Sequence, residues 1–88
     1  MKLIIVIVQD SDSSPVSKAL TEAGFRVTLI ASTGGFLRSG NSTLLIGTDG
    51  DKVETAIQII ADSCAPPEEP GMKRATLFVL DIDHYEQI

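Results

Sequence analysis

Four segments of the chain have the hydrophobic pattern of β-strands. Lys2–Gln9 is aliphatic almost throughout, which is typical of a strand that is buried on both faces. Phe25–Ala31 begins by alternating apolar with polar residues, the period-two pattern of a half-buried strand. Thr43–Gly47 and Ala75–Leu80 are shorter apolar runs, and they predict two further strands.

Two segments between these strands have the spacing of amphipathic helices. In the first, Ser14 is expected to cap the helix with Pro15 at the first helical position, and Gly24 is placed to end it in a left-handed conformation. The second is expected to begin near Asp49 or Asp51, whose negative charges favour a helix start. The apolar faces consist of Val16, Ala19, Leu20 and Ala23 in the first helix, and of Val53, Ala56, Ile57, Ile60, Ala61 and Cys64 in the second.

The predicted order of elements is strand, helix, strand, strand, helix, strand. Right-handed crossovers then place both helices on one face of a mostly antiparallel sheet, which is the α+β ferredoxin-like βαββαβ sandwich. The 88 residues are expected to form a single domain, 1–88. Because Lys2–Gln9 and Leu44–Ile46 are apolar on both faces and the helices cover only one, we expect another copy of the chain to cover the open face.

Composition narrows the classes of partner. A net charge of −5 argues against duplex nucleic acid. The longest apolar run, Leu3–Val8, is far too short to cross a bilayer and lacks the flanks of a signal peptide, so we expect a cytoplasmic protein without a membrane partner. The lone cysteine, Cys64, excludes an internal disulfide, and the lone histidine, His84, leaves little material for a metal site, so neither a metal nor another cofactor is expected.

The glycine-rich segment Ser32–Asn41 is the strongest candidate for a binding site. Its Gly34–Gly35 pair allows backbone amides to converge on an anion. Arg26 follows Phe25 in the predicted strand, so its side chain points away from the face that carries Phe25 and Val27. Its guanidinium is therefore available to a phosphate. No Asp or Glu occurs between residues 24 and 48, so this acidic protein has a locally cationic stretch that can hold a small anion.

Three other side chains suit a nucleotide. Asn41 offers both a donor and an acceptor to an adenine edge, Phe36 can stack on a base, and Thr28 adds a hydroxyl group. The same pattern also fits an ordinary hairpin loop whose glycines satisfy turn geometry and whose Phe36 caps the core. The segment is not a Walker P-loop, because no GKS or GKT motif follows the glycines.

Several stretches of the chain match the motifs of a known family. They are MKLIIVIVQD at residues 1–10, GFRVT at 24–28 and ASTGGFLRSGNSTLLIG at 31–47, the last of which contains the specific pattern TGGFLRxGN. The end of the chain adds ATLFVL at 75–80 and YEQ at 85–87. Together they make the chain closely resemble the PII-like cyclic di-AMP receptor family.

This resemblance implies a non-catalytic signal-transduction protein that forms a homotrimer, binds cyclic di-AMP or a related adenine nucleotide between subunits, and acts on an unidentified downstream protein. It implies hydrogen bonds to the ligand from Arg26, Thr28, Asn41 and Gly47, adenine pockets lined by Phe36, Leu37 and Phe78, and closure of the site by Gln87. Gly35 joins this set as part of the glycine pair that faces the anion.

Two features depart from the family pattern. The Ala65–Met72 loop is much shorter than the extended loop of family members, which leaves the signalling output open. Gly24 stands where a side-chain donor such as Asn is common in the family, so we expect one ligand contact to be missing.

An alternative on the same fold is an acylphosphatase-like enzyme, in which an arginine holds a phosphate and an asparagine orients water. Arg26 and Asn41 supply both groups. No general base lies near them in the sequence, however, so we expect no catalytic residues and no catalysis.

Overall fold

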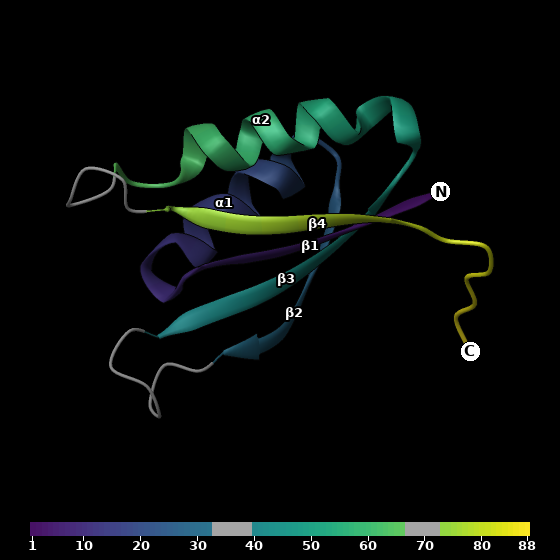
Figure 1. The fold of residues 1–88 in the computed structure, drawn as a ribbon, viewed down its shortest axis with the longest axis horizontal. Helices are drawn as coiled ribbons and strands as arrows, with labels where there is room; N and C mark the ends of the chain where they lie inside the picture. Colours follow the sequence, from purple (N-terminus) through teal and green to yellow (C-terminus); the bar gives the residue numbers. More distant parts are fainter. Residues whose placement is uncertain (33–39, 67–72) are drawn as a thin grey trace.

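The computed structural model describes residues 1–32, 40–66 and 73–88 (Figure 1). The elements in chain order are β1 (Lys2–Gln9), α1 (Asp10–Glu22), β2 (Arg26–Ser32), β3 (Asn41–Thr48), the 3-10 turn η1 (Gly50–Lys52), α2 (Val53–Ser63) and β4 (Ala75–Asp81). The first strand has the predicted bounds, and the other three lie where the hydrophobic pattern placed them. β3 is longer than expected, because it begins at Asn41 rather than at Thr43.

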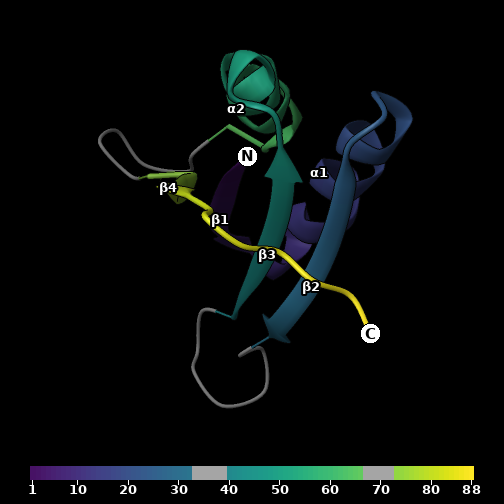
Figure 2. The ribbon, with the colours of Figure 1, turned by 90° about the vertical axis from the view of Figure 1, so that its right-hand side faces the viewer.

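The four strands form one sheet in the order β2-β3-β1-β4, and every neighbouring pair is antiparallel. Both helices lie on the same face of this sheet, as Figure 2 shows. This is the ferredoxin-like arrangement, so the predicted fold class is confirmed. The opposite face carries no helix in the part of the chain that the structure describes.

The hydrophobic core lies between the helices and the covered face of the sheet. Alternate residues of β1 point into it, because successive side chains of a strand face opposite ways. The fully buried side chains are Ile4, Val6 and Val8 of β1, Leu44 and Ile46 of β3, Val16 and Leu20 of α1, and Ala56 and Ile60 of α2. Cys64 is buried with them, and burial raises the pKa of its thiol, so it acts as a small apolar side chain. No helix among the described residues is both long enough and apolar enough to span a bilayer.

The start of α1 differs from the prediction. The helix begins at Asp10 instead of after Ser14, and Pro15 lies inside it. Proline has no N–H, so α1 lacks the hydrogen bond that the carbonyl of Ser11 would otherwise accept there. Ser14 is therefore not the N-cap, and the polar segment that precedes Pro15 is helical rather than a turn.

Tertiary contacts hold this first turn in place. The Asp10 N–H donates to the carbonyl oxygen of residue 40 at 3.1 Å, and the Ser42 hydroxyl donates to Asp10 Oδ1 at 2.5 Å. Asp12 is buried, and its Oδ1 accepts the Ala65 N–H at 3.1 Å. These bonds satisfy polar groups that would be costly to leave unpaired, and they tie α1 to β3 and to the end of α2.

The end of α1 follows the prediction. Gly24 has a φ of +95°, in the left-handed region that favours glycine. The Phe25 N–H donates to the Leu20 carbonyl and the Gly24 N–H to the Thr21 carbonyl, both at 3.0 Å. These are the two bonds of a Schellman motif, which turns the chain from α1 into β2.

Replacing Gly24 with alanine should lower the free energy of unfolding by about 1 kcal/mol, because an L-residue is strained at this φ. Gly47→Ala is a matched control, since Gly47 has no positive φ and an added Cβ there meets no atom within 4 Å. Urea unfolding of both variants at one protein concentration measures the difference. Equal stability of Gly24→Ala and the wild-type protein would contradict this account of the helix end.

The second helix is confirmed, but its start is more complex than expected. Asp49 precedes the 3-10 turn η1 and Asp51 lies within it, while α2 itself begins at Val53. Neither aspartate therefore begins α2, although the sequence had predicted that one of them would. In β2, a register shift between Leu29 and Ala31 ends the regular alternation that the sequence suggested.

Candidate functional site

The face of the sheet that the helices leave open carries several of the predicted ligand residues. The strand registers arrange this face in rows, each with one residue from β2, β3, β1 and β4. The first row is Arg26, Gly47, Leu3 and Leu80, and the second is Thr28, Leu45, Ile5 and Phe78. The rows are apolar across β1 and β4, and they end at β2 in a cation and a hydroxyl group. Four predicted residues therefore share this face: Arg26, Thr28, Gly47 and Phe78.

The remaining predicted residues are not part of this group. Asn41 pairs with Gln9 at the other end of β3, six residues from Gly47, which is about 20 Å along the strand at roughly 3.3 Å per residue. Gln87 lies in the exposed C-terminal segment, which continues past the end of β4 and beyond the sheet (Figure 1). Gly35, Phe36 and Leu37 lie outside the described residues. A single chain thus does not gather all the predicted residues that are described into one site.

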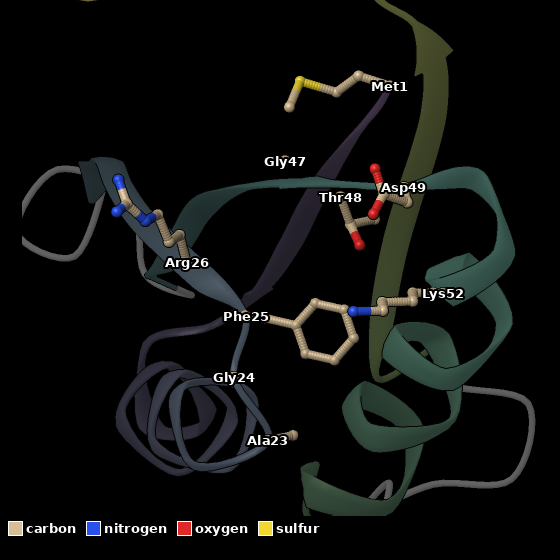
Figure 3. Close-up of a pocket in the computed structure, with 9 residues that line it drawn as sticks. All are labelled: Met1, Ala23, Gly24, Phe25, Arg26, Gly47, Thr48, Asp49 and Lys52. Atoms are coloured by element: carbon tan, nitrogen blue, oxygen red, sulfur yellow. The ribbon is translucent and has the colours of Figure 1, made fainter.

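A hollow of about 230 Å³ lies at the end of the sheet where Arg26 and Gly47 meet (Figure 3). It is bounded by the end of α1, the start of β2, the end of β3 and the turn before α2. The lining residues are Met1, Ala23, Gly24, Phe25, Arg26, Gly47, Thr48, Asp49 and Lys52. Phe25 and Thr48 are buried, and an added Cβ at Gly24 or Gly47 would meet no atom within 4 Å. The two glycines therefore leave room in the hollow.

The charged side chains that line this hollow form no ion pairs with one another. Arg26 and Lys52 form no ion pair or hydrogen bond through their side chains with any other described residue, although the Asp49 carboxylate also lines the hollow. Lys2, on the neighbouring strand, differs because its ammonium group pairs with Asp81. The hydrogen bond from Lys2, followed by its charge, lowers the pKa of the Asp81 carboxyl. Two cations thus remain available to an anion at this end of the sheet.

The sequence did not predict Lys52 as a site residue. It lies in the segment expected to turn into the second helix, 26 positions after Arg26. The two residues line one hollow because β2 pairs with β3 through Arg26 and Gly47, and η1 then follows the end of β3. The only signal in the sequence is a basic residue close to the end of a strand.

The geometry suits binding better than the acylphosphatase alternative. Arg26 pairs with Gly47, and Asn41 begins the same strand β3 about 20 Å away, so one chain cannot bring both groups to one phosphate. Within the described ranges, no group of three or more His, Cys, Asp or Glu side chains is placed to hold a metal ion. The hollow is lined by two cationic side chains and one carboxylate, and it leaves space for a ligand.

The fold and this hollow define a ferredoxin-like α+β protein with two unpaired cations, among its described residues, at one end of its sheet. The family model described as the cyclic-di-AMP receptor matches residues 1–70, and the chain belongs to this family. The family that the sequence motifs resembled is thereby confirmed.

A solved structure from Pediococcus pentosaceus, described as a functionally unknown protein, is also similar to this chain. The two share 36% sequence identity with a TM-score of 0.79, over 99% of this chain and 96% of the other. The similarity extends the common fold through β4, beyond the residues that the family model matches.

Proposed function

We propose that this protein is a non-catalytic receptor that binds cyclic di-AMP, or a closely related adenine nucleotide, at sites between the subunits of a homotrimer. Membership of the cyclic-di-AMP receptor family supports the ligand class. The observation that carries the proposal is the common position of Arg26, Thr28, Gly47 and Phe78 on the uncovered face of the sheet.

Each of these residues has a distinct role in the proposed site. The Arg26 guanidinium binds a phosphate with planar, paired donors, which a lysine cannot provide. The Thr28 hydroxyl lies two residues further along β2 on the same face and supplies a second donor. Gly47 lies opposite Arg26 and leaves the space for the phosphate open. Phe78 lies across the sheet on β4 and offers an aromatic surface to an adenine.

The spacing of these residues favours sites between subunits. Phe78 is three strands away from Thr28 in its row, about 14 Å at roughly 4.8 Å per strand. Asn41 lies still further from Arg26, at the other end of β3. A neighbouring copy packed on this face brings its own Asn41, Phe78 and C-terminal Gln87 close to the Arg26 of the first. The exposed apolar side chains of the face, with Phe78 at 53% and Leu80 at 48%, supply the surface that such packing buries.

Titration of the protein with cyclic di-AMP tests this proposal. At a ligand concentration about a hundredfold above the dissociation constant, binding should stabilise the fold by roughly 2.7 kcal/mol in a thermal-shift experiment. Cyclic di-GMP, ATP and AMP serve as competitors, and chromatography should recover the cyclic di-AMP unchanged. No stabilisation by cyclic di-AMP would contradict the proposed ligand, and conversion to a linear dinucleotide would contradict the non-catalytic role.

The Gly47→Val variant should bind cyclic di-AMP at least about tenfold more weakly, because its side chain projects into the space beside Arg26 that the phosphate needs. The fold should tolerate valine, since an added Cβ meets no neighbour and valine suits a strand. Isothermal titration calorimetry measures the affinity, and Gly50→Ala, outside the lining of the hollow, is the control. Wild-type affinity in Gly47→Val would place the phosphate elsewhere.

A further inference from the structure

The hollow beside Arg26 has a second cation on its other side. Lys52 ends η1, and its backbone N–H donates to the Asp49 carbonyl at 3.0 Å, which closes the turn before α2. Figure 3 shows the Lys52 side chain extending from this turn toward Phe25, while the Arg26 side chain lies on the β2 side with its guanidinium directed away from Lys52. Two cations from separate parts of the sequence thus flank the same space.

The Lys52 ammonium group forms no ion pair with another described residue. No ion pair joins it to Asp49, the carboxylate that lines the hollow with it, or to any other described acidic group. Its side chain is exposed and caps no helix, because neither η1 nor α2 has a side-chain cap bond. Lys52 therefore forms no ion pair or side-chain hydrogen bond that stabilises the described fold, and in a protein with a net charge of −5 its charge is available to an anion that enters the hollow.

The size of the hollow indicates which part of a ligand it takes. Drug-sized molecules fill pockets of about 300–1,000 Å³. A space of about 230 Å³ therefore holds only part of a dinucleotide. With a cation on each side and a glycine opposite Arg26, that part is a phosphate group rather than a base.

We propose that Lys52 is a second phosphate-binding residue, whose ammonium group and the Arg26 guanidinium hold one phosphodiester group of the ligand from two sides of the hollow. This inference rests on the proposed function and adds to it a contact from the turn before α2. Arg26 fixes the orientation of the phosphate through paired donors, and Lys52 contributes a point charge. Asp49 opposes both by repelling the anion.

Calorimetric titration of matched variants with cyclic di-AMP tests this role. Lys52→Gln should weaken binding about five- to tenfold, because it removes one charge-assisted contact at a partly exposed site. Lys52→Arg should restore affinity to within about twofold, since it keeps the charge. Lys18→Gln, an exposed lysine of α1 outside the hollow, is the control and should bind like the wild-type protein.

Three further measurements separate an electrostatic role from a structural one. Asp49→Asn should bind about twofold more tightly, since it removes the repelling charge and the Asp49 side chain caps nothing. Added salt should weaken binding by the wild-type protein more than binding by Lys52→Gln, because the ions screen a charge that the variant lacks. Thermal unfolding of unliganded Lys52→Gln should match the wild-type protein.

The outcomes distinguish this inference from the proposed function. Tight binding by the wild-type protein with unchanged affinity in Lys52→Gln overturns the role of Lys52 and leaves the receptor function intact. Equal losses of affinity in Lys52→Gln and Lys18→Gln also overturn the role of Lys52, because they would reflect only the change in the net charge of the protein. No binding by the wild-type protein overturns the receptor function and the role of Lys52 together.

Discussion

Replacing Arg26 with alanine should weaken cyclic di-AMP binding about ten- to a hundredfold, which is the loss of roughly 1.5–3 kcal/mol expected for a charge-assisted hydrogen bond. The protein is acidic overall, so the charge of a phosphodiester must be met by a cation in a defined position. Arg26 meets this need because it begins a paired strand, where its register with Gly47 fixes its backbone. Lys52, on a short turn, is held less firmly and should matter less.

The fold of Arg26→Ala should be unchanged. The side chain is exposed and has no ion pair or hydrogen bond with another described residue, so its loss removes no packing from the core. Arg74→Ala is the matched control, since Arg74 is also exposed and its guanidinium donates to the Ala61 carbonyl in the last turn of α2, at the end of the helix away from the hollow. Calorimetry of both variants, with circular dichroism to confirm folding, makes the comparison. An Arg26→Ala variant with wild-type affinity would show that the phosphate is held by other groups.

The two ends of α1 show how far the local sequence predicts structure. Its end was predictable because Gly24 provides the left-handed residue that the Schellman motif requires, and all the bonds of that motif lie within six residues. Its start was not, because the bonds that hold the first turn come from far along the chain. Asp12, for example, binds the N–H of Ala65, 53 residues away. Such contacts outweigh the local preference of Pro15 for a helix start.

In the candidate site too, some residues could be predicted from the sequence, and others are placed only by pairing between distant segments. Arg26, Thr28, Gly47 and Phe78 could be named from the resemblance to the family, and the strand registers then place them on one face. Lys52 could not be named, because it reaches the hollow only through the pairing of β2 with β3 and the turn that follows. The hydrophobic period of a strand indicates which face a residue takes, but it does not show which residue lies opposite. Register therefore had to come from the structure.

The largest effect on assembly is expected at Phe78. Its side chain lies on the open face of β4 and is 53% exposed in a single chain, between the apolar neighbours Leu80 and Ile5. Under the proposed homotrimer other copies pack on this face, so Phe78 lies at the boundary between subunits, beside the proposed ligand site, and is shielded from water. Aspartate at position 78 would then place an unpaired carboxylate in an apolar interface, at a cost of more than about 3 kcal/mol per subunit. In an isolated chain the same change costs little, because the position is open to water.

Gel filtration coupled to light scattering should therefore find the wild-type protein at about 28 kDa, three times the chain mass of 9.4 kDa, and Phe78→Asp at the mass of one chain. Thr55→Asp is the matched control, because it adds the same charge at an exposed position in the first turn of α2, where an acid is favourable. It should remain trimeric. A wild-type monomer at micromolar concentration would refute the homotrimer, and a trimeric Phe78→Asp would show that the copies pack through another surface. A wild-type monomer would also leave the proposed ligand site without a second subunit to complete it, whereas a trimeric Phe78→Asp would mean that no neighbouring chain packs against Phe78.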